Sequence, residues 1–439
     1  MKKFTEKLAE SISFKLFTIV VLVLLLLIPT AFVKSLIKER EATRNSVIYE
    51  ISSKWGNQQT VTGPFITVPY YTYYKKDKEV IKQQSFAHFL PEQLNITGNL
   101  NPEIRYRGIY KVIVYNSELE IRGNFLAPSF KEWKVRPEDI LWDEAYLAMG
   151  ISDMRGIKDE LKINFDNATY DVSPGVPNLD LISKGINSKI KLADKDSFDF
   201  NFKLNLNGSE ALKFIPIGKT TNVEINSDWN TPSFDGEFLP DPRNVSDSGF
   251  QANWQVLQVN RTFPQKWTGS KYNIYDSQFG VKLLFPVDQY LKSFRAAKYA
   301  IMFIGLTFVV FFFSEILNKK RIHPIQYLLV GIAICVFYVL LISLAEHFGF
   351  ATAYIVGGSA TIGLITLFSK SVFKSTKLAL MLMSILIALY TFLFTILQLQ
   401  DYSLLLGSLG LFIVLGAIMY LSRKIDWYKP IQRDNNSIE

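Results

Sequence analysis

Residues 325–344 read IQYLLVGIAICVFYVLLISL, and this stretch decides the fold. It contains no Asp, Glu, Lys, Arg or Pro. About 20 predominantly apolar residues form a helix long enough to cross the hydrocarbon core of a bilayer. We therefore expect this segment to be a transmembrane helix.

Five similar runs lie on either side of it. One is close to the N-terminus and four fall in the last third of the chain: residues 16–33, 299–313 with an extension to 317, 350–368, 378–397 and 404–421. The region between the first run and the others contains no run of that length. The sequence thus predicts an N-terminal segment 1–15, an anchor helix 16–33, a large domain 34–298, a five-helix transmembrane bundle 299–421 and a tail 422–439.

We interpret the first run as an uncleaved anchor, with a cleaved signal peptide as the alternative. The run is longer than the usual apolar core of a signal peptide. Its end, Pro29-Thr30-Ala31-Phe32-Val33-Lys34, is a poor small-x-small cleavage site.

The distribution of Lys and Arg among the short loops predicts the orientation of the helices. The loops around 319–321 and 370–377 and both chain termini are basic, whereas loops 345–349 and 398–403 contain no Lys or Arg. Both termini are therefore predicted to be cytoplasmic, with residues 34–298 on the outer side. One observation disagrees, because the outer flank of the first helix carries as many basic residues as its inner flank: Lys34, Lys38, Arg40 and Arg44.

The net charge of +8 comes from the same basic loops and termini. The predicted cytoplasmic pieces carry 14 Lys or Arg and 5 Asp or Glu, whereas residues 45–298 carry 30 of each. A nucleic-acid-binding domain concentrates basic residues on its own surface, so this charge predicts no nucleic-acid partner. The predicted partner is the lipid bilayer, including the anionic lipid of its inner leaflet.

Residues 45–298 are predicted to form an all-β, antiparallel, sandwich-like domain. Every second residue from Phe198 to Leu206 is apolar, which is the period of a half-buried strand, and Asn207-Gly208 directly afterwards is a strong turn signal. Many such short patterns separated by Gly and Pro are typical of packed antiparallel sheets. Residues 128–148 are the best candidate for a short helix.

The sequence contains little that catalysis or cofactor binding requires. There is one Cys, and the predicted topology separates the three His residues, so no three-His metal site is expected within one chain. Metalloprotease, Walker, nucleophile-elbow and dinucleotide-binding motifs are absent. We therefore predict a protein that is not an enzyme and holds no metal or cofactor. For the pair Asp153 and Arg155, a structural salt bridge or turn cap is preferred to catalysis.

The predicted membrane helices contain few ionisable residues. Glu315 lies near the inner end of the second helix, and Glu346 and His347 lie at the outer end of the third. All three are predicted close to the interfaces, where water is available, whereas an ion relay needs charge at mid-membrane depth. Glycines such as Gly357 and Gly410 predict close helix packing rather than a pore.

Short motifs recur in one order along nearly the whole chain. They include GPFI (63–66), DMRG (153–156), PSFDGEFLP (232–240), SGFQANW (248–254), PVDQY (286–290), HPIQYLLVG (323–331), LLLG (404–407) and IDWY (425–428). Together they resemble the CreD family over residues 14–428. The resemblance implies a Gram-negative inner-membrane protein with a periplasmic domain and a link to cell envelope integrity and envelope stress. It implies no catalytic residue.

Two family motifs permit physical interpretations. Pro324 is tolerated in a first helical turn, and His323 beside it can meet lipid phosphate or cap neighbouring carbonyls. Glu346 and His347 place an acid and a base together at the outer face, where we expect them to tether the outer domain to the bundle. The alternative is that both are solvated loop residues.

The expected function is support of the cell envelope by a non-enzymatic inner-membrane protein. Its periplasmic β-domain would bind an envelope protein, a lipid or a cell-wall component. The first alternative is a transporter or chaperone of a lipid or small hydrophobic molecule, which a hydrophobic groove would favour. The second alternative is an envelope-remodelling enzyme.

Overall fold

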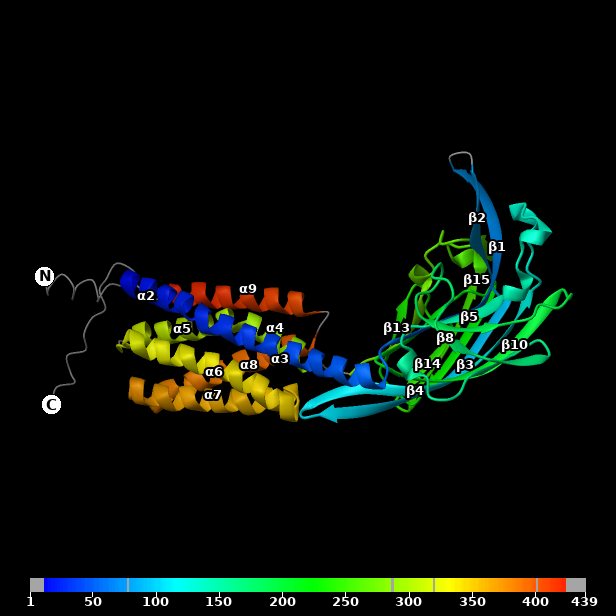
Figure 1. The fold of residues 1–439 in the computed structure, drawn as a ribbon. Helices are drawn as coiled ribbons and strands as arrows, with labels where there is room; N and C mark the ends of the chain where they lie inside the picture. Colours follow the sequence, from blue (N-terminus) through cyan, green and yellow to red (C-terminus); the bar gives the residue numbers. More distant parts are fainter. Residues whose placement is uncertain (1–11, 77–78, 286–287, 319, 400–401, 424–439) are drawn as a thin grey trace, which may run out of the picture. The chain divides into compact units, whose positions relative to one another are not determined.

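The computed structural model describes residues 12–76, 79–285, 288–318, 320–399 and 402–423 (Figure 1). The chain divides into two compact units. The membrane unit comprises Met1–Arg44 and Val287–Glu439, and the β-rich unit comprises Asn45–Pro286. The predicted N-terminal segment 1–15 and tail 422–439 lie largely outside the described residues.

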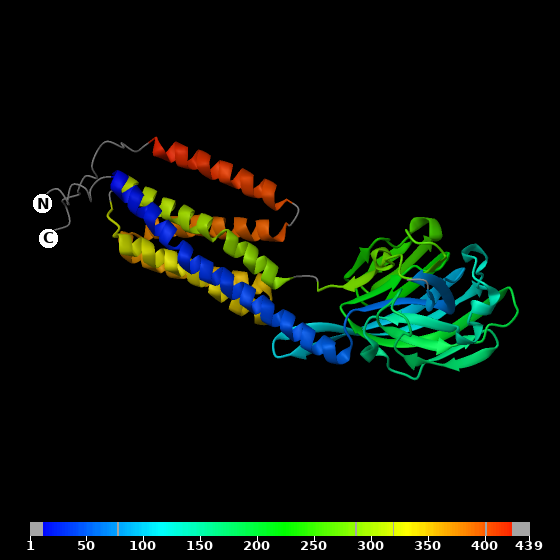
Figure 2. The ribbon, with the colours of Figure 1, turned by 45° about the horizontal axis from the view of Figure 1, so that its top comes forward.

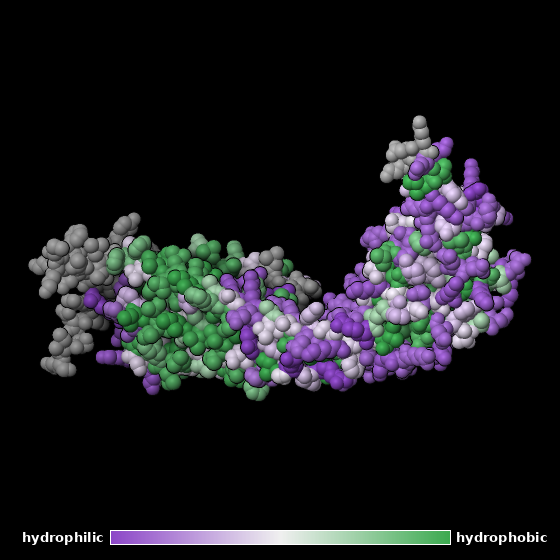
Figure 3. All heavy atoms as spheres, viewed as in Figure 1, coloured by the Kyte–Doolittle hydropathy of each residue, from purple (hydrophilic) through white to green (hydrophobic). Residues whose placement is uncertain are grey.

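All six predicted apolar helices are present within the described residues, and each is long and apolar enough to cross a membrane. The first is formed by α2 and α3 together. Hydrophobic residues gather over these helices in the space-filling view (Figure 3). The helices are α2 (Ile12–Leu25), α3 (Leu27–Trp55), α5 (Ala300–Leu317), α6 (Pro324–Phe348), α7 (Phe350–Phe373), α8 (Thr376–Gln398) and α9 (Ser403–Ser422).

The predicted range 34–298 for the β-rich domain is too wide at both ends. Helix α3 continues to Trp55, and a short helix α4 (Gln289–Lys298) precedes α5. The break between α2 and α3 falls at Leu26. The N–H of Leu26 still donates to the carbonyl of Leu22, at 3.0 Å. Pro29 accounts for the break, because it has no N–H to donate to the carbonyl of Leu25, four residues earlier.

Close packing predicted from the glycines is present at α7 and absent from most of α9. A Cβ added to Gly357 would lie 3.6 Å from Phe337, and one added to Gly358 would lie 3.2 Å from Tyr390. In contrast, nothing described lies within 4 Å of such an atom at Gly407 or Gly416 of α9. The ribbon in Figure 2 shows α9 set apart along the edge of the other helices.

The β-rich unit contains two sheets within the described residues. In the nine-stranded sheet, β2 (Glu79–Phe89) pairs with β1 (Gln59–Lys76), and β16 (Lys266–Thr268) pairs with β2. The remaining order is β13 (Pro232–Gly236), β17 (Phe279–Leu283), β11 (Ala211–Ile215), β1 (Gln59–Lys76), β5 (Tyr146–Ile151), β9 (Gly185–Lys189), β8 (Ser173–Pro174).

The second sheet has eight described strands. Their order is β14 (Arg243–Ser246), β15 (Gly249–Leu257), β12 (Thr220–Ser227), β3 (Gln93–Arg107), β4 (Tyr110–Leu126), β10 (Ser197–Ser209), β6 (Lys162–Phe165), β7 (Ala168–Asp171). Buried apolar residues of both sheets belong to one core cluster. Two pairings, β1 with β11 and β12 with β3, are parallel, so the sheets are mainly but not wholly antiparallel.

Strand β10 confirms the strongest strand prediction and corrects the adjoining turn. The apolar residues from Phe198 to Leu206 are buried and the residues between them face outward. The strand continues through Asn207-Gly208, and the turn falls at Glu210, whose φ is +59°. Gly208 serves packing instead, because a Cβ there would lie 2.3 Å from the hydroxyl oxygen of Tyr115.

The short helix predicted over residues 128–148 is replaced by three 3-10 turns and the start of β5. The turns are Lys131–Trp133, Pro137–Asp139 and Trp142–Glu144. Trp133 and Trp142 each lie edge-on to Phe130, at centroid distances of 5.4 and 5.6 Å. Tertiary packing of aromatic rings therefore outweighs the weak helical pattern.

Candidate functional sites at the two ends of helix α6

Glu315 is the centre of the first site, the α6 N-terminal cluster, defined as Lys15, Glu315, Ile322, His323 and Tyr327. The Glu315 side chain is 0% exposed. Its carboxylate accepts hydrogen bonds from the backbone N–H of Ile322 at 2.8 Å and from the hydroxyl of Tyr327 at 3.0 Å. Lys15 of α2 forms an ion pair with the same carboxylate. A buried carboxylate requires such partners, so the cluster ties α2, α5 and α6 together.

This arrangement differs from the hydrated environment predicted for Glu315. The residue is in the last turn of α5, as expected, but protein donors take the place of water. A cavity of about 500 Å³ adjoins the cluster and is lined by its side chains together with Phe14, Thr18 and Gln326. Because the carboxylate already has three donors, the geometry favours a clamp between helices over a proton relay.

His323 and Pro324 begin α6. The ring Nδ1 of His323 accepts a hydrogen bond from the N–H of Ile325 at 3.3 Å, and the side chain of Gln326 accepts one from the N–H of His323 at 2.9 Å. This reciprocal pair is a capping box in which His replaces the usual Ser or Thr. Pro324 occupies the first turn, as predicted. His323 caps amides rather than the carbonyls that the sequence led us to expect.

Glu346 is the centre of the second site, the α6 C-terminal cluster, defined as Arg40, Arg44, Asp288, Tyr290 and Glu346. Arg40 donates to both carboxylate oxygens of Glu346, from Nε at 2.8 Å and from Nη2 at 2.6 Å. The hydroxyl of Tyr290 donates to the same carboxylate at 3.0 Å. Bidentate arginine–carboxylate pairs are among the strongest polar contacts in proteins. The contacts of Arg40 and Tyr290 with Glu346 together connect α3, α4 and α6.

A second ion pair in this cluster strengthens the junction of α3 with α4. Arg44 lies 3.1 Å from Asp288, and its guanidinium lies over the ring of Tyr290 at 5.0 Å. Asp288 is also the N-cap of α4, where its carboxylate accepts from the N–H groups of Tyr290 and Leu291 at 2.9 and 3.1 Å. One carboxylate therefore starts α4 and holds α3 against it.

His347 does not join this cluster. Its side chain is exposed and its ring lies 6.2 Å from that of Phe348. Successive residues of a helix point in directions about 100° apart, so Glu346 and His347 face different surroundings. Two described partners of Glu346, Arg40 and Tyr290, belong to the membrane unit and lie on the helices that precede and follow the β-rich unit in the chain. The expected tether between the outer domain and the bundle stays a prediction.

Asp153 and Arg155 form both an ion pair and a cap in the β-rich unit. Two nitrogens of Arg155 lie 2.9 and 2.7 Å from the carboxylate of Asp153, which also accepts from the backbone N–H of Asn57 at 3.0 Å. Hydrogen bonding to Arg155 lowers the pKa of Asp153 to about 2. Gly156 is needed in this turn, because a Cβ there would lie 2.2 Å from the carbonyl oxygen of Asn207.

A buried histidine in the β-rich unit was not singled out from the sequence. His88 is 1% exposed and its two ring nitrogens lie 3.0 Å from the hydroxyl of Thr67 and 3.2 Å from the carboxylate of Asp180. Burial lowers the pKa of His88, although Asp180 opposes this shift. The ring lies among those of Phe65 and Trp267. This chain of polar groups satisfies a buried imidazole, which is the ordinary structural role of such a residue.

Within the described ranges, no three His, Cys, Asp or Glu side chains converge as metal ligands would.

The sequence analysis did not identify Lys15, Arg40 and Tyr290 as partners of Glu315 and Glu346, because they are far in sequence from the acids that they bind. One signal was available: Arg40 and Arg44 stood on the side of the first helix where the charge rule expects no excess of basic residues. Both arginines form ion pairs in the structure.

Comparison with known proteins gives a consistent assignment. The family described as "Inner membrane protein CreD" matches residues 11–428 of this chain. The chain is also 34% identical to "Inner membrane protein CreD" of Escherichia coli (strain K12) over 416 residues, which cover 92% of this chain and 91% of the relative. The chain therefore belongs to the CreD family of inner membrane proteins.

Proposed function

We propose that this protein is a non-enzymatic anchor that supports the cell envelope, and that its β-rich unit acts in the periplasm by binding an envelope protein, lipid or cell-wall component. The observation that carries the proposal is that α3 is fixed by side-chain contacts in both units. In the membrane unit, Arg40 and Arg44 hold it to α6 and α4. A helix held by contacts in each unit is suited to anchor the β-rich unit to the membrane.

In the β-rich unit, the last turns of α3 contact the hairpin of β3 and β4. Trp55 donates its indole N–H to the carbonyl oxygen of Tyr115 at 3.1 Å. The guanidinium of Arg105 lies over the Trp55 ring at 4.6 Å, and Arg107 forms an ion pair with Glu50. These contacts stiffen the segment where the chain enters the sheets.

We also propose the predicted orientation, with both termini in the cytoplasm. Arg40 and Arg44 were two of the four basic residues that opposed it. They flank a long segment, and long segments are translocated largely regardless of their charge, so the charge pattern of the short loops prevails.

A polar groove supports a polar partner for the β-rich unit. It has a volume of about 470 Å³ and is lined by side chains from β12, β3, β4 and β10, which are adjacent strands of the eight-stranded sheet. Its amide and carboxylate groups include Asn99, Asn205, Glu118 and Glu224. Two sheets that share one core favour a sandwich, in which such an outward face stays free for binding.

Lipid handling is the second candidate function. It is favoured by a mostly apolar cavity of about 1200 Å³ in the membrane unit. This volume exceeds the roughly 300–1,000 Å³ that is usual for sites of drug-sized molecules.

The anchor proposal is tested in a bacterial strain that lacks its own CreD-family gene. We expect the full-length chain to restore exclusion of a membrane-impermeant dye and survival in detergent. The variant Arg40→Gln should insert to the same level yet protect less, because α3 loses its contact with Glu346. Lys34→Gln on the same helix is the control with an equal change of charge. Full protection by Arg40→Gln, or no protection by the wild-type chain, would refute the proposal.

A further inference from the structure

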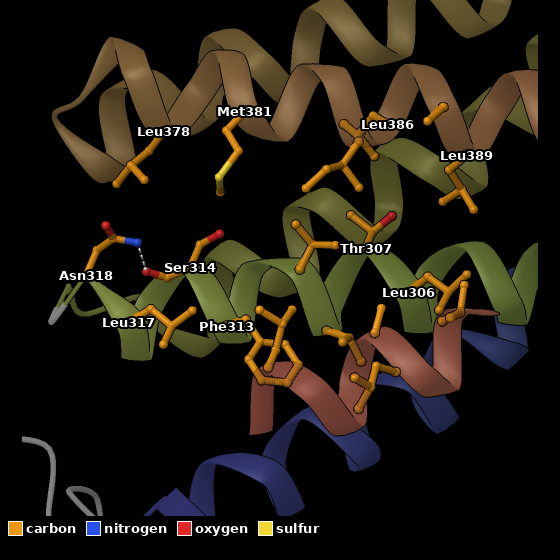
Figure 4. A pocket seen from close by; sticks show the side chains of 18 of the residues that line it. Leu306, Thr307, Phe313, Ser314, Leu317, Asn318, Leu378, Met381, Leu386 and Leu389 are labelled. Atoms are coloured by element: carbon orange, nitrogen blue, oxygen red, sulfur yellow. Dashed lines mark hydrogen bonds between the residues drawn. The ribbon is translucent and has the colours of Figure 1, made fainter. Parts of the chain in front are cut away.

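A large cavity lies between helices α5, α8 and α9 of the membrane unit. Its volume is about 1200 Å³ (Figure 4). One wall is formed by α5 from Leu306 to Leu317 and another by α8 from Leu378 to Phe392. At a rise of about 1.5 Å per residue, these walls extend over roughly 16–21 Å, which suits an extended hydrocarbon chain.

Rings of α5 and α8 meet near one end of the cavity. Phe303 of α5 and Tyr390 of α8 are in edge-to-face contact there, with ring centroids 5.0 Å apart. At the other end the lining reaches Asn318 and Ser375. We call this end, at the C-terminus of α5 and the N-terminus of α8, the loop end of the cavity.

Helix α9 forms the remaining side and makes contact at two places. Gly410 lies against the ring of Phe392, where an added Cβ would be 2.1 Å from a ring carbon. Farther along, Ile418 and Leu421 pack on a small cluster that contains Phe313. Between these contacts the lining is apolar, and α9 itself is unburied over its membrane window.

The charged lining residues all lie at the loop end. Lys320 and Lys377 line the cavity there, together with the polar residues Ser314, Asn318 and Ser375, and no described lining residue is acidic. Both lysines are exposed. The N-terminus of α8 lies at the same place, and the helix dipole there also favours an anion. The site thus combines a long apolar space with a positive end.

We propose that this cavity is a binding site for an anionic phospholipid. One acyl chain would lie between α5 and α8, and the phosphate would contact Lys320 and Lys377. Charge complementarity selects this occupant over a zwitterionic lipid, because neighbouring basic residues attract anionic headgroups. The loop end coincides with the basic loops, so the lipid would belong to the leaflet on that side. This site is independent of the proposed role of the β-rich unit.

Native mass spectrometry of the full-length protein in mild detergent tests the proposal. The probes are dioleoyl phosphatidylglycerol and dioleoyl phosphatidylcholine, added at equal concentration. We expect the wild-type protein to retain phosphatidylglycerol preferentially, and the double variant Lys320→Gln, Lys377→Gln to lose about 30-fold in its affinity, as the loss of two headgroup contacts predicts. Ala417→Phe, which fills the cavity from α9, should reduce binding of both lipids.

The matched control is the double variant Lys370→Gln, Lys374→Gln. It removes the same charge from exposed lysines at the C-terminal end of α7, close in sequence to Lys377, that do not line the cavity. This variant should bind phosphatidylglycerol like the wild-type protein. Equal losses in the two double variants would show general surface attraction and overturn the proposal. Undiminished binding by the Lys320 and Lys377 variant, with an unchanged unfolding temperature, would also overturn it.

Discussion

Arg40 and Glu346, which are 306 positions apart in sequence, form a bidentate contact with distances of 2.8 and 2.6 Å. The Glu346 side chain is only 6% exposed, whereas that of Arg40 is 37% exposed. Removal of the acid charge leaves the arginine with access to water, so the cost is smaller than for a fully buried pair. The contact joins α3 to the C-terminal end of α6 within the membrane unit.

Glu346→Gln should destabilise the membrane unit by about 1–3 kcal/mol, because the amide keeps one acceptor but loses the ion pair. Thermal unfolding in detergent, followed by helix circular dichroism, measures the change. Glu39→Gln, at an exposed position on α3, is the control with the same chemical change. An unfolding temperature of Glu346→Gln equal to that of the control would contradict the clamp.

Asp153→Asn should weaken the β-rich unit at neutral pH and reduce its acid sensitivity. The pKa of Asp153 is lowered to about 2 by Arg155 and by backbone donors. A lowered carboxyl pKa contributes stability above the unfolded-state value near 4, and that stability is lost as pH falls toward the folded-state value. Unfolding temperatures between about pH 4 and pH 2 should therefore converge for the wild-type protein and the variant. Parallel curves across that window would contradict this role.

Gly156→Ala should destabilise the same turn by about 1–3 kcal/mol through overpacking. The new methyl group would lie 2.2 Å from the Asn207 oxygen and 2.5 Å from Nε2 of Gln59. Because Gln59 and Asn207 are held by hydrogen bonds of 2.9 Å, neither moves freely. Intrinsic tryptophan fluorescence during denaturant unfolding reports the change. A variant as stable as the wild-type protein would mean that the turn relaxes.

Local patterns in the sequence predicted the helices and the clearest strand, since each depends on neighbouring residues. The apolar run at 325–344 and the alternation from Phe198 to Leu206 are examples. The ends of the β-rich region were harder, because the polar half of α3 is helical owing to contacts of residues such as Arg40 and Trp55 with distant partners. Glu315 was identified without its partners for the same reason.

The orientation of the helices predicts the activity of reporter fusions. Alkaline phosphatase is active only outside the cytoplasm, so a fusion after residue 372, in the last turn of α7 next to the basic loop, should be inactive. A fusion in the loop between α6 and α7, after residue 348, should be active. Expression levels measured by immunoblotting control for degradation. The reverse pattern would place the β-rich unit in the cytoplasm.

His88 predicts loss of stability in mild acid. Burial lowers the pKa of His88 below the ordinary value near 6.5, while the Asp180 carboxylate favours the protonated form. Tyr146 and Thr67 are the other polar groups nearby. The unfolded chain therefore binds a proton before the folded protein does, so stability is complete above pH 6.5 and falls as pH drops below that value. In His88→Gln this decline should be absent, and the difference in unfolding temperature between wild type and variant should shrink from pH 7.5 to pH 5. His347→Gln, at an exposed position, should retain the wild-type decline. A difference independent of pH would mean that His88 contributes through packing alone.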